Sequence, residues 1–225
     1  ERVCVENQLV AIDDGQGHRR YEIDFEDFEK KVSDPEVKMF ILCSPHNPVA
    51  RVWSTEELTR MIELCQKHDV LVFSDEIHGD LIMRGYKHVP AGAISQDNVI
   101  VAVAPTKTFN LAGIKASAVI IPDDELKKRY VQQLEINQVA SLNVFAPIAM
   151  KTAYEKGDDY LEQLIDHLDG NIRYAKEYLN EHLPEAYVYT TEGTYFLWID
   201  FNGTGLSADE IYRTVLEKAK VAGDI

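Results

Sequence analysis

Residues 70–81, VLVFSDEIHGDL, open with a run of apolar and β-branched residues and end in a cluster of polar and charged ones. Two other stretches have the same form, MFILCSPHNP at 39–48 and NVIVAVAPTKTF at 98–109. A fourth apolar run, ASAVIIP, occupies 116–122. Short continuous apolar runs are typical of strands buried on both faces, so each of the four predicts a strand of one sheet.

Amphipathic stretches lie between and after these strands. STEELTRMIELCQKHD at 54–69 has apolar residues at helical spacing, and Ser54 and Glu57 form the pattern of a capping box. DDELKKRYVQQLEINQ at 123–138 predicts a second helix, whose acidic start suits the positive end of the helix dipole. The alternation predicts an α/β fold in which helices sandwich a mostly parallel sheet.

The pattern changes after Phe145, and one long helical stretch then runs from Asp158 to Leu183. We place a domain boundary there, which divides the chain into a large domain at 1–157 and, at 158–225, an interdomain helix with part of a small α+β domain. In the second part we expect strands AYVYTT and TYFLWIDF joined by a turn at Gly193, then a helix capped by Ser207. Both chain ends read as strands in progress, so we expect a segment of a longer protein.

Composition excludes several classes of partner. The formal net charge of −15 argues against nucleic acid and anionic membranes, which bind surplus Lys and Arg. Cys4, Cys43 and Cys65 are an odd set without metal-ligand spacing, so we expect neither a disulfide framework nor a metal site, and a reducing compartment. The apolar runs are far shorter than the ~20 residues of a membrane span, and we predict a cytoplasmic protein.

The polar clusters that follow the strands should meet at one edge of the sheet, because ligands of open α/β sheets bind beyond the carboxyl ends of the strands. Lys107 comes directly after a buried strand and is flanked by Thr106 and Thr108. A partly desolvated lysine has a free amine that can form an imine. The alternative is an ordinary lysine in a surface loop.

Asp75 and Asn47 are the other candidates at this edge. A carboxylate directly after a buried strand needs a cationic or hydrogen-bonding partner, such as a pyridinium nitrogen. Asp75 could also be a helix N-cap, or a metal ligand together with Glu76 and His78. Asn47 lies between His46 and Pro48, where the proline-rich backbone could direct its amide to a ligand oxygen, or it is a plain turn residue.

Taken together, SPHNPVARVW, SDEIHGDL and APTKTFNLAG resemble the motifs of the class I and II aminotransferase superfamily of pyridoxal-phosphate enzymes, which have fold type I. In detail they look most like the branch of cystathionine β-lyases and cysteine-S-conjugate β-lyases. The resemblance covers the whole chain. It implies that the N-terminal segment and the end of the small domain lie outside this sequence. By the same resemblance, those outside parts would contain the ring-stacking aromatic, the glycine-containing phosphate loop and the substrate-carboxylate arginine.

The resemblance also implies roles for six residues. Lys107 would bind pyridoxal 5'-phosphate as a Schiff base, Asp75 would pair with the pyridine nitrogen, and Asn47 would donate to the phenolic oxygen. His78 stands where many aminotransferases have a tyrosine, and Thr106 and Lys115 match positions that contact the phosphate.

Three positions depart from the family pattern. Ser44 and Ala50 replace the Asn and Gly of its Asn-Pro-x-Asn-Pro-x-Gly loop, and alanine tolerates positive φ less well than glycine. Ala104 stands where many relatives have a phosphate-binding serine. We therefore expect an altered turn and one phosphate contact fewer.

The resemblance implies a lyase that acts on an amino-acid substrate, cystathionine or a cysteine S-conjugate, and releases a thiol, pyruvate and ammonia. One alternative is an aminotransferase, and another is a non-catalytic domain or inactive fragment of the same fold. Relatives are dimers with sites between subunits, so SLNVFAPIAM at 141–150 is either a homodimer interface or a buried helix start.

Overall fold

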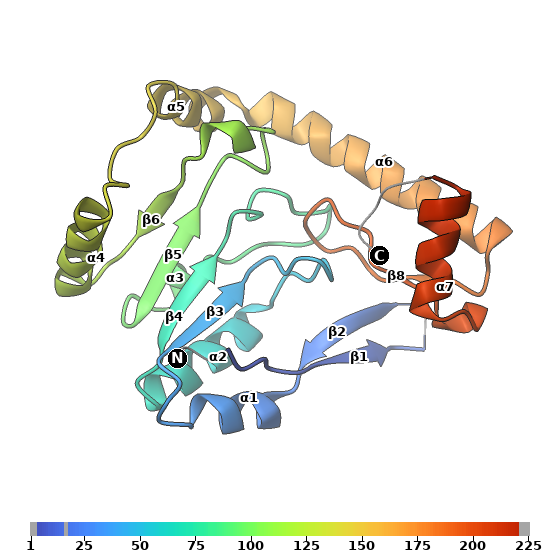
Figure 1. Cartoon of the computed structure of the whole chain (residues 1–225), viewed down its shortest axis with the longest axis horizontal. Coiled ribbons are helices and arrows are strands. Elements are labelled where there is room, and N and C mark those ends of the chain that lie inside the picture. The colour runs from blue at the N-terminus through green and yellow to red at the C-terminus, as the bar shows by residue number, and fades with distance from the viewer. Residues whose placement is uncertain (1–3, 16–17, 221–225) are drawn as a thin grey trace.

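The computed structural model describes residues 4–15 and 18–220, and its centre is a four-stranded sheet (Figure 1). The strands are β3 (Met39–Cys43), β4 (Leu71–Asp75), β5 (Val99–Val103) and β6 (Ala118–Ile120), in that spatial order. The first three are parallel to one another, and β6 is antiparallel to β5. The prediction of a mostly parallel α/β sheet is confirmed.

Helices α1 (Phe25–Val32), α2 (Thr55–Lys67) and α3 (Ala91–Ile94) pack with one face of this sheet and enclose the main hydrophobic core. The core includes Leu42 and Val72 from the strands and Leu58 from α2, each at most 2% exposed. Both hydrogen bonds of the predicted Ser54 capping box are present at the start of α2. The chain thus returns over this face between β3 and β4 through α2 and between β4 and β5 through α3.

The other face of β3 differs from the prediction of strands buried on both sides. Phe40 and Leu42 point into the core, whereas Met39 and Ile41, which alternate with them, are 49% and 67% exposed. The main core cluster lies on one face only, so within the described residues the outer face of β3 remains open. The apolar run predicted the strand correctly but not its burial.

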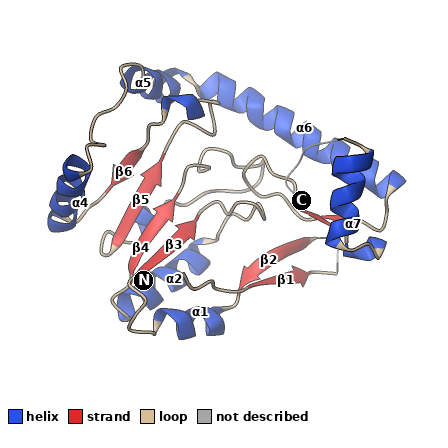
Figure 2. Ribbon diagram, viewed as in Figure 1, coloured by secondary structure: helices blue, strands red, loops and turns tan. Residues whose placement is uncertain are grey.

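Three helices follow the sheet: α4 (Asp124–Ile136), α5 (Ala146–Lys156) and α6 (Asp158–His182). Figure 2 shows α4 beside the β6 edge and the long α6 running across the molecule toward its C-terminal part. Ile165 of α6 packs on Leu81 and Met83, which lie in the loop after β4. Helix α6 begins at the residue where we placed the domain boundary, and the division into two domains stays a prediction.

An N-terminal hairpin, β1 (Leu9–Asp13) with β2 (Arg19–Ile23), is a feature that the sequence analysis missed. Residues 4–8 have no strand structure, so within the described residues the strand expected near the start begins at Leu9; residues 1–3 lie outside them. The strand expected at the other end falls on 221–225, outside the described residues.

The predicted pair of long strands near the C-terminus is wrong in extent. Only β7 (Tyr187–Val188) and β8 (Ile199–Asp200) form a ladder, two residues long. Gly193 is no hairpin turn and forms an isolated bridge with Ile82 instead. The segment between the strands directs its backbone groups to other loops, which shortens the ladder.

The chain then forms a 3-10 turn at Asn202–Thr204, α7 (Ala208–Arg213) and a π-helical turn at Thr214–Lys218. The predicted cap at Ser207 is present. The cysteines Cys4, Cys43 and Cys65 are free thiols. Among the described residues, no helix has the length and apolar character that a membrane crossing requires.

Candidate active site

The carboxyl ends of the three parallel strands lie side by side. Cys43 at the end of β3 is level with Asp75 at the end of β4, and Asp75 is level with Ala102 near the end of β5. The loops that leave these strands therefore start at one edge of the sheet, as the sequence predicted. Each of them contains candidate site residues.

Asp75 is the last residue of β4 and is half-buried. Its Oδ1 accepts a long hydrogen bond of 3.3 Å from the N–H of Ile77. No helix begins here, because a turn follows β4, so the N-cap alternative is wrong. The carboxylate has acceptor capacity left for a cationic or protonated partner.

Glu76 has a separate, structural position. It is buried and accepts hydrogen bonds from Ser74 Oγ at 2.9 Å and from the N–H of Ala91 at 2.8 Å, and its Oε2 lies 3.0 Å from His88 Nε2. The alternative in which Glu76 joins Asp75 and His78 around a metal finds no support. Among the described residues, no group of three or more His, Cys, Asp and Glu side chains could bind a metal ion.

His78 is 2% exposed, and neither of its ring nitrogens has a hydrogen-bond partner. Burial lowers its pKa, the positive charge of Lys107 lowers it further, and Asp75 acts in the opposite direction. The ring is therefore neutral near pH 7 and has one N–H to donate and one nitrogen to accept. Unpaired buried polar atoms are rare in proteins, and they mark this position as one suited to a ligand.

Lys107 lies in a series of turns after β5 and is half-buried. Its neighbours fix these turns, since Thr108 Oγ1 donates to Asp80 Oδ2 at 2.9 Å and Phe109 N–H donates to Pro105 O at 2.9 Å. Within the described part of the chain, the amine of Lys107 has no hydrogen bond or ion pair. An amine that is placed by a rigid turn and is not engaged elsewhere is available for a covalent bond to a carbonyl group.

Asn47 lies at the tip of the loop after β3, and its side chain is exposed. The Ser44–Pro45 and Asn47–Pro48 peptide bonds are cis. Ala50 has φ of 60°, so it adopts the left-handed conformation expected of a glycine in spite of its Cβ. Asn47 N–H donates to Cys43 Sγ at 3.4 Å, which fixes its backbone near the end of β3.

Thr106 and Lys115 are placed differently from each other. Thr106 is half-buried beside Lys107, and its carbonyl accepts from Leu111 N–H at 2.9 Å. Lys115 is exposed, has φ of 47°, and ends the 3-10 turn Ala112–Ile114. A phosphate contact by either residue stays a prediction.

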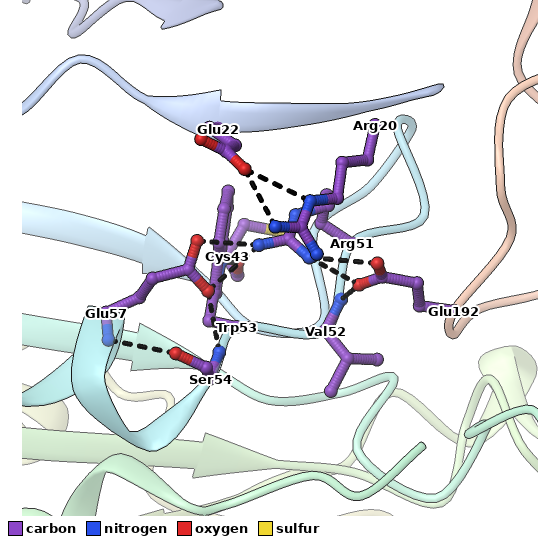
Figure 3. A network of polar contacts seen from close by, with 9 residues as sticks. All are labelled: Arg20, Glu22, Cys43, Arg51, Val52, Trp53, Ser54, Glu57 and Glu192. Carbon is purple, nitrogen blue, oxygen red and sulfur yellow. Dashed lines mark hydrogen bonds and ion pairs between the residues drawn. The ribbon is translucent and has the colours of Figure 1, made fainter. Parts of the chain in front are cut away.

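Sequence reasoning missed two contributions from the C-terminal part of the chain. The rings of Tyr195 and Phe196 lie 5.3 and 6.0 Å from the ring of His78, centroid to centroid. A buried ion pair also joins Arg51, next to the Asn47 loop, to Glu192 (Figure 3). Both pair residues more than a hundred positions apart, and no local pattern in the sequence signals such contacts.

These side chains fit the groups of pyridoxal phosphate. Lys107 has a free amine for the aldehyde, Asp75 has acceptor capacity for a protonated ring nitrogen, and His78 has two unpaired ring nitrogens near the same place. Asn47 adds an exposed amide at the neighbouring strand end. The arrangement suits an amine-based covalent chemistry better than a metal-based one.

The comparisons with known proteins place this chain in a family. The family model of aminotransferase class I and II matches residues 10–223, and the chain belongs to this family. It is 45% identical over 204 residues to the cystathionine beta-lyase PatB of Bacillus subtilis, which covers 89% of this chain and 53% of that protein. The chain thus spans about half the length of the curated relative.

Solved structures share the fold. Cystalysin from Treponema denticola, whose crystal structure contains a pyridoxal 5'-phosphate cofactor, matches 98% of this chain and 55% of its own with a TM-score of 0.92 and 33% identity. The PLP-bound C-S lyase from Staphylococcus hominis matches 97% of this chain and 51% of its own with a TM-score of 0.81 and 32% identity. The fold is that of these pyridoxal-phosphate proteins.

Proposed function

We propose that the protein to which this chain belongs is a pyridoxal-phosphate-dependent carbon–sulfur β-lyase acting on cystathionine or cysteine S-conjugates. The observation that carries the proposal is that the charges of Lys107 and Asp75 both act on the unpaired His78 ring, in loops that leave one edge of the sheet. The similarity to a cystathionine beta-lyase and to C-S lyase structures supports the choice of reaction. The domain division at residue 157 is part of the same proposal.

In this proposal each residue acts on a stated atom. Lys107 would hold the cofactor covalently through Nζ, and the same Nζ, once free, would remove the proton from the substrate Cα. Asp75 would keep a proton on the pyridine nitrogen, and Asn47 and His78 would hydrogen-bond the phenolic oxygen. Thr106 and Lys115 would bind the phosphate, the lysine by charge rather than by a bidentate contact.

The cofactor, when bound, supplies an electron sink for the negative charge that develops at the substrate Cα. The bond from Cβ to sulfur would then break, and the sulfur would leave with the electron pair and take up the proton held by Lys107 Nζ to give the thiol. Water hydrolyses the remaining three-carbon unit to pyruvate and ammonia. Neutral His78 can orient an oxygen without adding a charge of its own.

The second candidate is an aminotransferase, which the family's name favours. The same residues perform the first proton transfer in both reactions, and the outcome depends on whether the proton returns before the sulfur leaves. Release of pyruvate and thiol from cystathionine, compared with transfer of the amino group to an added 2-oxo acid, separates the two. A chain that keeps the fold without catalysis would do neither.

The test of the central claim is chemical labelling. The chain is incubated with pyridoxal phosphate, reduced with borohydride and digested, and the peptides are mapped by mass spectrometry. We expect the pyridoxyl group on Lys107 and none on the Lys107→Ala variant. A label spread over exposed lysines, or no label, would contradict the role of Lys107 and favour the non-catalytic alternative for this chain.

We also propose a homodimer and a cytoplasmic location. In the stretch 141–150, helix α5 begins at Ala146, which is 0% exposed, whereas Val144, Phe145 and Ile148 are 76%, 73% and 69% exposed. Three exposed apolar side chains within five residues support a protein interface. The free cysteines are compatible with a reducing compartment.

A further inference from the structure

The segment Glu192–Thr194 contacts the loop that carries Asn47. The N–H groups of Glu192 and Gly193 both donate to the carbonyl of Ala50, at 2.9 and 3.1 Å. Ala50 is 1% exposed and has the left-handed backbone conformation. The C-terminal part of the chain therefore binds the backbone of the Asn47 loop at its most constrained residue.

The same segment contacts the turn that carries His78. Thr194 N–H donates to Leu81 O at 2.7 Å, and Met83 N–H donates to Glu192 O at 3.0 Å. Leu81 N–H in turn donates to the carbonyl of His78 at 2.9 Å. One short segment thus joins two loops that leave neighbouring strands.

Gly193 shows how closely these loops approach. A Cβ at this position would lie 2.8 Å from Val52 Cγ2, 3.1 Å from Leu81 O and 3.2 Å from Pro45 Cβ. Its φ is not in the left-handed region, so glycine is required here for space and not for backbone freedom. The segment Glu192–Thr194 therefore packs between the two loops, without space for a methyl group at Gly193.

The side chain of Glu192 binds the loop a second time. Its two oxygens accept from Arg51 Nη1 at 2.9 and 2.7 Å, and Oε2 also accepts from Val52 N–H at 2.8 Å (Figure 3). Arg51 and Glu192 are each 3% exposed, so neither charge has water as an alternative partner. The other terminal nitrogen of the guanidinium, Arg51 Nη2, donates to Glu57 Oε1 at 2.6 Å and to Glu57 Oε2 at 2.9 Å.

We infer that Glu192 is a positioning residue of the proposed site: by binding Arg51 and the Val52 N–H, it fixes the loop after β3 and with it the amide of Asn47. The inference rests on the proposed function for the identity of the ligand, but the position of the loop can be measured without any ligand. Glu57 is the matched control, since it binds the same guanidinium from the start of α2 and makes no contact with Ala50.

The first experiment is amide hydrogen exchange of the chain without ligand, in the wild type, Glu192→Gln and Glu57→Gln. Loss of a buried charged acceptor should make the Ala50 and Val52 amides exchange about tenfold faster in Glu192→Gln. Glu57→Gln should affect chiefly the first turn of α2. Exchange at Ala50 that stays at the wild-type rate in Glu192→Gln would overturn the inference.

The second experiment asks whether Glu192 acts through Asn47. The probe is pyridoxamine 5'-phosphate, which has no aldehyde and cannot bond to Lys107, and its dissociation constant is measured by calorimetry. Glu192→Gln should weaken binding about tenfold in the wild-type background and have little effect when Asn47→Ala is already present. Equal weakening in both backgrounds would show a general structural role and overturn the inference.

Failures of the two proposals can be told apart. If the wild-type chain does not bind the probe, the proposed function fails for this chain, while hydrogen exchange still decides the role of Glu192. If Glu192→Gln does not fold, the double variant Arg51→Met with Glu192→Met replaces the buried pair by apolar side chains of similar size, which proteins often tolerate. Faster exchange at Ala50 in that variant supports the inference, and unchanged exchange overturns it.

Discussion

His78 makes the stability of the chain depend on pH. Its pKa in the folded state is lowered from the ordinary 6.5 by burial and by Lys107. Between the lowered pKa and the ordinary one, the unfolded chain binds more protons at His78 than the folded chain does. The free energy of unfolding therefore increases with pH in this range. The contribution is fully present above the ordinary pKa and is lost as pH falls through the range below it.

We expect the free energy of unfolding to decrease between pH 7 and pH 5, and to decrease less in His78→Gln, whose side chain does not titrate. Urea denaturation at the two pH values measures the difference. His46, whose pKa burial and Arg51 also lower, contributes with the same sign, so His46→Gln should reduce the dependence as well. A His78→Gln variant with the full wild-type decrease would show that His78 takes up its proton freely in the folded state.

At the same scale, sequence reasoning found the residues but not their partners. Asp75 and Lys107 could be selected because each lies in the polar cluster that follows a continuous apolar run. That Tyr195 lies against His78 could not be predicted, because this contact depends on how a distant segment returns to the sheet. Charge and polarity mark a residue as reactive, whereas contacts across the fold decide what surrounds it.

At the scale of elements, two glycines that look alike in the sequence have opposite roles. Gly170 lies inside α6, where an added Cβ would meet no atom within 4 Å. Gly170→Ala should stabilise the chain by about 0.5–1 kcal/mol, because alanine loses less backbone entropy in a helix. Gly193→Ala should destabilise it by about 1–3 kcal/mol, because the Cβ has Val52 at 2.8 Å.

Denaturant unfolding of the two variants measures both changes against the wild type. If Gly193→Ala did not lower the free energy of unfolding relative to Gly170→Ala, the neighbouring loops would have moved to relieve the close approach at Gly193. That result would also weaken the view that Glu192–Thr194 fixes those loops.

The elements themselves were predictable to different degrees. The strands β3, β4 and β5 and the helix α2 follow from local patterns, since apolar runs and a capping box depend on neighbours in sequence. The length of the β7–β8 ladder was overestimated, because after the Tyr189–Trp198 hydrogen bond the N–H groups of Glu192–Thr194 donate to Ala50 and Leu81 instead. Tertiary hydrogen bonds there override a local preference for strand.

At the scale of the whole molecule, the exposed apolar residues Val144, Phe145 and Ile148 suit an interface with a partner. Asn143 Oδ1 accepts from the N–H groups of Phe145 and Ala146, at 3.0 and 3.1 Å, and so fixes the start of α5. Val144 and Phe145 are nevertheless more than 70% exposed, at 76% and 73%. An apolar surface that is ordered and open at once is suited to a partner, which we propose to be a second copy of the chain.

The variant Phe145→Glu should shift the chain from dimer to monomer, because a dimer would bury the new carboxylate without a cation to pair with it. Sedimentation velocity over a range of concentrations measures the change. Tyr174→Glu is the matched control, since Tyr174 is 68% exposed on α6 and lies outside the proposed interface, so its sedimentation should match the wild type.

A wild type that is monomeric at every concentration, or a Phe145→Glu variant that still dimerises like the wild type, would contradict this interface. In the second case the dimer would have to form through another surface, for which the open outer face of β3, with Met39 and Ile41, would be the next to test in the same way.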